Sequence, residues 1–137
     1  MIKVVIDTNI LLVSVSSRSP HHWLFQELIN RKFILCVTTE ILLEYEEIIG
    51  KEMNFPVADN VMRTLENLPN VQLFSRFFHW NLIKKDPDDN KFTDCAVASN
   101  ATFLVSHDKH FKILEKIGFP KIKVITIEEF YIIVNKL

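Results

Sequence analysis

The chain has 137 residues, of which 48% are hydrophobic and 24% charged, the proportions of a folded domain rather than of a disordered segment. Sixteen Lys and Arg residues against 17 Asp and Glu residues give a net charge of −1, which argues against a strongly basic protein that wraps nucleic acid. Two glycines are too few for a P-loop or a Gly-rich dinucleotide-binding loop.

Short apolar runs alternate with helical patterns along the whole chain. We expect strands at residues 4–6, 33–37, 71–74, 103–105 and 123–126. We expect helices over residues 8–15, from Pro20 onward, and over residues 39–50, 57–68, 87–100, 109–117 and 128–137. Residues 75–85 show no clear period. This alternation predicts an α/β fold, a three-layer α/β/α domain with a mostly parallel sheet of about five strands, with residues 1–137 forming a single domain.

The two cysteines, Cys36 and Cys95, form no CxxC pair and have no metal-binding spacing. They are therefore predicted to be reduced thiols in or near the core of an intracellular protein. The apolar start of the chain is broken by Asp7, and no apolar run approaches the roughly 20 residues of a membrane span. We expect a soluble, cytoplasmic protein with no membrane partner.

Two predicted strands are each followed by an aspartate. Asp7 follows residues 4–6, and Asp108 lies three residues beyond residues 103–105. Ligands of an open parallel sheet bind beyond the carboxyl ends of its strands. A single aspartate there is most often a turn or cap residue, but two of them predict a site at this edge.

Further acidic side chains come from two predicted helices. On the helix over residues 39–50, Glu44 and Glu46 flank the apolar stripe, and periodicity does not choose between them. Residues 86–94 contain four aspartates, some of which suit a helix start. Asp89 flanks the apolar face of that helix, whereas Asp94 lies a turn further in, where it has no capping role.

Carboxylates gathered at one edge repel each other, and a cation relieves that repulsion. Carboxylate oxygens are the ligands that Mg²⁺ and Mn²⁺ prefer. The histidines lack the spacing of a zinc site. A divalent cation held by acids most often serves phosphate chemistry, so the pattern indicates metal-dependent hydrolysis of a phosphate ester.

Four short motifs, taken together and in order, resemble the PIN-domain ribonucleases, and most closely the VapC-like toxins of bacterial toxin–antitoxin pairs. The motifs are Val4-Val5-Ile6-Asp7-Thr8-Asn9, Thr39-x-x-x-x-Glu44, Asp86-Pro-Asp-Asp89-Asn-Lys91-Phe-x-Asp94 and Leu104-Val-Ser-His107-Asp108-Lys109-His110. The resemblance as a whole covers residues 2 to about 126. The resemblance implies an endoribonuclease that hydrolyses RNA with Mg²⁺ or Mn²⁺, forms a homodimer and binds an antitoxin protein.

The resemblance also implies roles for individual residues. Asp7, Glu44 and Asp108 match three of the family's four acids, and its spacing favours Asp89 as the fourth. Asp94 would be an additional ligand or a water-orienting group, and Asn9 would orient Asp7. Thr8 or Thr39 would contact a ligand or a metal-bound water. Lys91 or Lys109 would lie near substrate phosphates.

One position departs from the family pattern. The family commonly has a small residue, often glycine, directly before its last aspartate, whereas this chain has His107. Two arrangements are open: the imidazole points away from the site, or it narrows the cleft.

Two other functions compete with the ribonuclease. A phosphohydrolase with Asp7 as nucleophile would need a second aspartate two residues later, where this chain has Asn9. A non-catalytic regulatory module could use the same acids to hold a structural cation or receive a phosphate. A phospho-acceptor, however, would need a lysine after a later strand, where this chain has Asp108.

Overall fold

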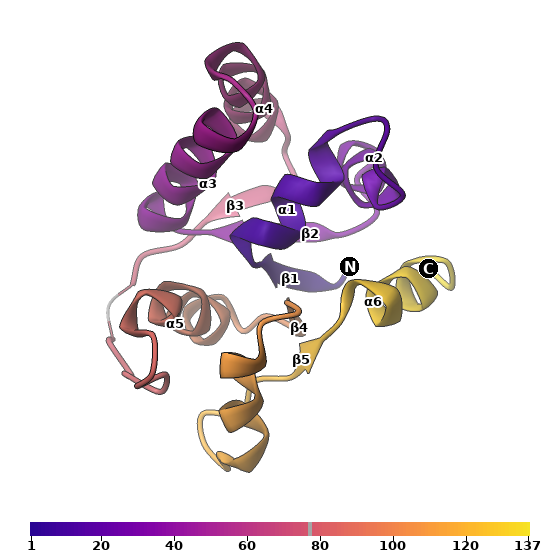
Figure 1. The fold of residues 1–137 in the computed structure, drawn as a ribbon. Helices are drawn as coiled ribbons and strands as arrows, with labels where there is room; N and C mark the ends of the chain where they lie inside the picture. The colour runs from indigo at the N-terminus through magenta and orange to yellow at the C-terminus, as the bar shows by residue number, and fades with distance from the viewer. Residues whose placement is uncertain (77) are drawn as a thin grey trace.

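A parallel five-stranded sheet forms the centre of the molecule (Figure 1), in a computed structural model that describes residues 1–76 and 78–137. The strand order is β3-β2-β1-β4-β5, and all four neighbouring pairs are parallel. The strands are β1 (Lys3–Ile6), β2 (Ile34–Val37), β3 (Val71–Leu73), β4 (Phe103–Val105) and β5 (Val124–Ile125). The predicted parallel sheet is confirmed.

Helices cover both faces of the sheet, as the three-layer prediction requires. The α-helices are α1 (Thr8–Val15), α2 (His22–Ile29), α3 (Thr39–Glu52), α4 (Phe55–Asn67), α5 (Asn90–Ser99) and α6 (Ile127–Val134), and the 3-10 helices are η1 (Pro87–Asp89) and η2 (Lys109–Lys116). Figure 1 shows α1 to α4 on one side of the sheet and α5 on the other. Helix α6 returns to α2, where the Trp23 and Phe130 rings lie 6.1 Å apart.

Side-chain caps explain where three of the helices begin. The Thr38 hydroxyl accepts a hydrogen bond from Ile41 N (3.2 Å) at the start of α3. The Asn54 side chain caps α4 by accepting from Val57 N (2.9 Å). Thr126 and Glu129 form a reciprocal capping box at the start of α6. Each cap satisfies backbone N–H groups that the first helical turn leaves unpaired.

Some predicted boundaries were wrong for identifiable reasons. Gly50 was expected to end α3, but the helix continues to Glu52, and Gly50 faces Ala58 of α4 at a distance where a Cβ would make ordinary van der Waals contact. The second helix begins at His22 rather than at Pro20. The segment 109–116 is a 3-10 helix. Residues 75–85 contain no helix or strand within the part of the chain that the structure describes.

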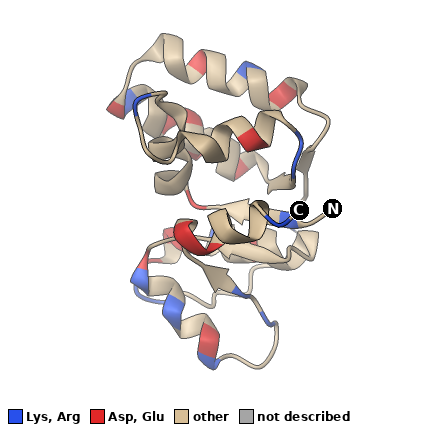
Figure 2. Cartoon of the chain, turned by 90° about the vertical axis from the view of Figure 1, so that its right-hand side faces the viewer, with Lys and Arg blue, Asp and Glu red and all other residues tan. Residues whose placement is uncertain are grey.

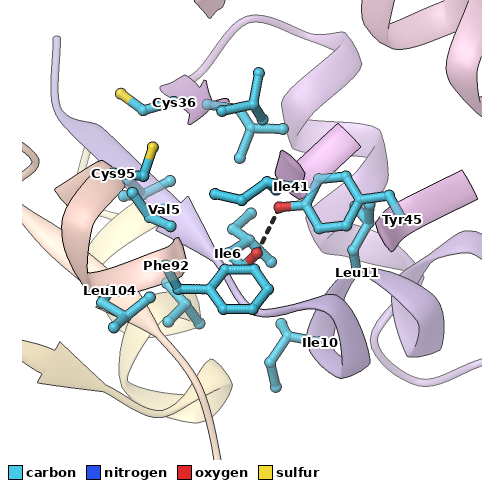
Figure 3. Close-up of a cluster of buried hydrophobic side chains, with 14 of the residues drawn as sticks. Val5, Ile6, Ile10, Leu11, Cys36, Ile41, Tyr45, Phe92, Cys95 and Leu104 are labelled. Atoms are coloured by element: carbon cyan, nitrogen blue, oxygen red, sulfur yellow. Dashed lines mark hydrogen bonds between the residues drawn. The ribbon is translucent and has the colours of Figure 1, made fainter. Parts of the chain in front are cut away.

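The core lies between the sheet and the helices on each face (Figure 3). The apolar side chains of residues 4–6 in β1 and 104–105 in β4 pack with Phe92 of α5 and with Tyr45 of α3, and all of them are fully or almost fully buried. Cys36 and Cys95 are both buried free thiols. The Tyr45 hydroxyl donates a hydrogen bond to the Ile6 carbonyl (Figure 3), which fixes α3 to the end of β1.

The order in which the chain adds strands to the sheet reverses at its centre, between β1 and β4. From β1 the chain builds outward to β2 and β3, and then crosses to β4 and β5 on the other side. Such a switch point leaves a crevice at the carboxyl ends of the two central strands. Ile6 and Val105 are paired there, so the residues that follow both strands lie at this crevice. No helix within the described part of the chain is both long and apolar enough to cross a membrane.

Candidate active site

Asp7 and Asp108 both lie at the switch point, and Ser106 links them. Asp7 is 7% exposed and its backbone N–H donates to Val105 O (3.1 Å). The Ser106 hydroxyl donates to Asp7 Oδ2 (2.8 Å) and accepts from Asp108 N (2.9 Å). Residues 99 positions apart in the sequence are thus tied together at one edge of the sheet.

Glu44 reaches the same edge from α3. Its Oε2 accepts a hydrogen bond from the Thr8 hydroxyl, next to Asp7 in the sequence. The neighbouring Tyr45 anchors this turn of α3 to Ile6, so Glu44 is held beside the end of β1. Glu46 is exposed. The structure therefore makes the choice between Glu44 and Glu46 that periodicity left open.

Asp89 lies on the other side of Asp108, where His110 connects the two. His110 Nδ1 is 3.4 Å from Asp89 Oδ2 and 3.4 Å from Asp108 Oδ1. One ligand atom each from Asp86, Asp89 and His110 lies within 4.8 Å of the others. Asp86 also caps η1 by accepting from Asp88 N (3.2 Å). A metal ion could be held among these three side chains.

Sequence reasoning missed His110 and gave Asp86 only its capping role. His110 follows Asp108 by two residues, and its backbone N–H donates to Asp108 Oδ1 (2.9 Å). That tight turn brings the imidazole back over the aspartates. The available signal was the motif Asp108-Lys109-His110, but no spacing rule for a metal ligand covers it.

The electrostatics at Asp7 are unfavourable to a carboxylate. Burial raises the pKa of Asp7, and the nearby charges of Asp108 and Glu44 raise it further, against the lowering effect of the hydrogen bond from Ser106. An ionised Asp7 is poorly solvated and lies near other negative charges, and both effects disfavour its charged form.

Asp89 is affected in the same way. Burial, followed by the charges of Asp86, Asp108 and Asp7, raises the pKa of Asp89 to about 6. Asp7 and Asp108 thus act on Asp89, while Asp108 and Glu44 act on Asp7. We call Asp7, Glu44, Asp89 and Asp108 the acid cluster. A divalent cation is the simplest way to relieve such repulsion, and hard oxygen ligands suit Mg²⁺ or Mn²⁺.

Comparison with known families identifies the domain to which these residues belong. The PIN domain family profile matches residues 3–110 of the chain, a segment that contains the whole acid cluster. The chain belongs to the PIN domain family. No curated protein compared with the chain matches it in sequence.

Two solved structures share the fold of this PIN domain. One is a VapBC complex from Rickettsia felis bound to a DNA fragment from its promoter: the TM-score is 0.63 at 16% identity, covering 91% of this chain and 98% of that chain. The other is a DNA-bound VapBC complex from Salmonella typhimurium, with a TM-score of 0.59 at 18% identity, covering 93% and 99%. At these identities the likeness establishes the fold.

The structure of the PIN domain gives Asp94 different partners from the acid cluster. Asp94 is 1% exposed. Its Oδ2 accepts from Arg76 Nε (2.6 Å) and its Oδ1 from Trp80 N (3.1 Å). Arg76 Nη1 also pairs with Glu40 (2.9 Å). Asp94 therefore fastens part of the segment 75–85 to α5, and this contact accounts for its burial without a metal.

The two lysines expected near substrate phosphates are placed differently. Lys91 Nζ lies 2.6 Å from Glu44 Oε1 and 2.9 Å from Asp88 Oδ1. Although burial acts against it, the hydrogen bonds to Glu44 and Asp88 raise the pKa of Lys91. Its ammonium group therefore already partly neutralises the carboxylate of Glu44. Lys109 is exposed and lines two surface cavities.

The supporting residues also differ in position. Thr8 contacts Glu44, as described. Asn9 is exposed, and within the described residues Ser106, rather than Asn9, donates a side-chain hydrogen bond to Asp7. Thr39 is exposed, and the neighbouring Thr38 supplies the helix cap.

His107, the position that departs from the family pattern, is turned away from the acid cluster. Its Nε2 lies 3.0 Å from Glu128 Oε1 and accepts from Ile127 N (3.4 Å). Of the two arrangements open from the sequence, the imidazole takes the one that packs against the start of α6.

Proposed function

We propose that this PIN domain is an endoribonuclease that uses Mg²⁺ or Mn²⁺, and that it acts as the toxin of a toxin–antitoxin pair. The single observation that carries the proposal is the acid cluster, in which four carboxylates from four different segments lie around the switch point of the sheet, linked through Ser106, Thr8 and His110. Two of them, Asp7 and Asp89, have raised pKa values because of burial and of neighbouring acids.

We assign the metal to Asp7, Glu44, Asp89 and Asp108, with Asp86 and His110 at its edge. Bound there, a divalent cation would polarise a phosphoryl oxygen and lower the pKa of a water bound to it. The carboxylates of the acid cluster would hold and orient that cation. Ser106 fixes Asp7 and Asp108 relative to each other, and Thr8 fixes Glu44. Asp94 is assigned a structural role, because it holds Arg76 and the backbone at Trp80 against α5.

The test compares two glutamates on the same helix. We expect Glu44→Gln, like Asp7→Asn, to lower Mn²⁺-dependent cleavage of single-stranded RNA by at least about 100-fold, because each removes a proposed ligand. Glu46→Gln is the matched control, since Glu46 is exposed two residues further along α3. Circular dichroism checks folding. Full activity of folded Asp7→Asn or Glu44→Gln would overturn the assignment.

The choice of substrate separates the ribonuclease from the competing phosphohydrolase and from the regulatory module. An enzyme with Asp7 as nucleophile would hydrolyse a small phosphomonoester and form an acid-stable phosphoenzyme. The ribonuclease should cut internal RNA bonds and leave such a monoester intact. A regulatory module would bind Mn²⁺, measured by calorimetry, without hydrolysing either substrate.

The partners follow from the resemblance to VapC-like toxins. We propose an antitoxin protein, a homodimer of the PIN domain, and a cytoplasmic location, with residues 1–137 acting as one nuclease domain. The two structures of similar fold are VapBC complexes, which supports an antitoxin partner. Expression of the chain should slow growth, and Asp7→Asn should remove that effect.

A further inference from the structure

A cavity of about 820 Å³ lies beside the acid cluster, between residues 81–85 and η2. Its volume is within the range of pockets that bind small organic ligands. Basic side chains dominate its lining: Lys84, Lys85, Lys109, Lys112 and Lys116, together with His110. We call this cavity the lysine pocket.

The positive charge of the lysine pocket is not neutralised by any residue that the structure describes. Among those residues, no aspartate or glutamate lines the pocket. None of its five lysines takes part in an ion pair with another described residue. Lys91 is the contrast, because it pairs with both Glu44 and Asp88. The pocket lysines are therefore available to an anionic ligand.

The lysine pocket adjoins the acid cluster through His110. This residue lines the pocket, and its ring lies 3.4 Å from both Asp89 and Asp108. A ligand in the pocket would therefore end beside the carboxylates that we assign to the metal.

The other side of Asp108 has the opposite character. A second cavity, of about 450 Å³, shares Lys109 and Lys112 with the lysine pocket, but it is also lined by Asp108, Glu115, Glu128 and Glu129. Figure 2 shows mainly basic residues along η2, at the bottom of the view, with an acidic residue among them, and acidic residues at the start of α6. A polyanion would be attracted to one side of the acid cluster and repelled from the other.

The lysine pocket also has an apolar component. Ile83, which is 2% exposed, lines it with Leu82 from one side, and Ile113 and Ile117 line it from η2. Apolar side chains next to unpaired lysines match the chemistry of a nucleotide, which has a flat base and a charged phosphate. An acidic peptide would use the lysines but not the apolar surface.

From these observations we propose that the lysine pocket binds the nucleotides of single-stranded RNA on one side of the bond that is cut. The lysines contact phosphates, the apolar side chains contact a base, and the chain then passes His110 to reach the acid cluster. The inference rests on the proposed ribonuclease function, and it adds a direction in which the RNA lies across the site.

The experiment measures binding of a 12-nucleotide single-stranded RNA to the full chain carrying Asp7→Asn, which prevents cleavage. The test variant adds Lys84→Gln, Lys85→Gln and Lys116→Gln, which line the lysine pocket and not the second cavity. The matched control adds Lys32→Gln, Lys51→Gln and Lys136→Gln, three exposed lysines that do not line the pocket. Lys109 and Lys112 are left intact because both border the two cavities.

We expect the test variant to bind RNA on the order of tenfold more weakly at about 0.1 M salt, with a salt slope smaller by about 2, since each phosphate contact contributes about 0.7. The control should keep the slope of the parent. An unchanged slope in the test variant overturns the inference, even if the wild-type chain cuts RNA. The inference also fails if the test variant loses binding of an oligoglutamate peptide but keeps its affinity for RNA.

The two proposals fail in different ways. If RNA binding depends on the pocket but the wild-type chain does not cleave RNA in Mn²⁺, the nuclease proposal is wrong and the proposed role of the pocket stands. If the chain cleaves RNA and the three substitutions leave its KM unchanged, the proposed role of the pocket is wrong and the nuclease proposal stands. A parent protein that does not bind RNA at all overturns both.

Discussion

Two groups of acidic side chains in this PIN domain differ in what compensates their charge. Asp94 and Glu40 share the Arg76 guanidinium, with Asp94 also accepting a backbone N–H. Asp7 and Asp89 instead face other acids, and their pKa values are raised. The comparison teaches that buried acids with an arginine partner hold the fold together, whereas buried acids facing one another require a ligand.

The most severe test of this comparison is Asp94→Asn. Losing the charge leaves Arg76, whose side chain is 14% exposed, without its buried partner, so we expect the free energy of unfolding to fall by about 3 kcal/mol. RNA cleavage per folded molecule should remain within a few-fold of wild type. Urea denaturation and an activity assay measure both. If the Asp94→Asn variant kept full stability but lost activity, Asp94 would have to be counted among the metal ligands.

The same substitution at Asp89 should act in the opposite direction when no metal is present. The pKa of Asp89 is about 6, above its usual value of about 3.9. Its stabilising contribution is therefore complete below about pH 4 and is lost as the pH rises through 6. At pH 7.5 in a chelator, Asp89→Asn should raise the free energy of unfolding by about 2 kcal/mol, and the gain should shrink at pH 4.5.

Metal addition gives the control for Asp89. Mn²⁺ should stabilise the parent against thermal unfolding at pH 7.5, because a ligand that binds the folded state favours it. The shift should be much smaller in Asp89→Asn. Equal shifts in the two proteins would show that Asp89 does not bind the ion, and a destabilised variant in chelator would contradict the contrast with Asp94.

The smallest effect is expected for Glu40→Gln. Its side chain is 52% exposed, and exposed ion pairs contribute at most about 1 kcal/mol. We expect a loss of about 0.5 kcal/mol or less in urea denaturation, with cleavage unchanged. A loss as large as that of Asp94→Asn would mean that Arg76 depends on its outer partner rather than on its buried one.

Local patterns were sufficient to predict the sheet and most helices. Buried parallel strands are short apolar runs, and β1 and β4 fall where such runs occur. The same reasoning failed at Gly50, because a single glycine does not by itself end a helix, and α3 continues to Glu52. It also failed to separate Asp94 from Asp89, because Arg76 reaches Asp94 from a segment without periodicity.

Predictions about the site depended on geometry that a helical wheel does not contain. Glu44 was distinguished from Glu46 by the Thr8 hydroxyl, which donates to Glu44, whereas Glu46 is exposed. His110 was missed because a turn of η2, rather than a spacing, brings its ring to Asp89 and Asp108. Long-range contacts of this kind appear only when the fold is known.

The central position of β1 has a consequence for synthesis of the protein. Strand β1 pairs on one side with residues that are synthesised much later than itself, since Val4 is registered with Phe103. A nascent chain that already contains Asp7 cannot complete the sheet, or bring Ser106 to Asp7, until β4 has emerged. Products that end before β4 would therefore lack both the central strand pair and the assembled acid cluster.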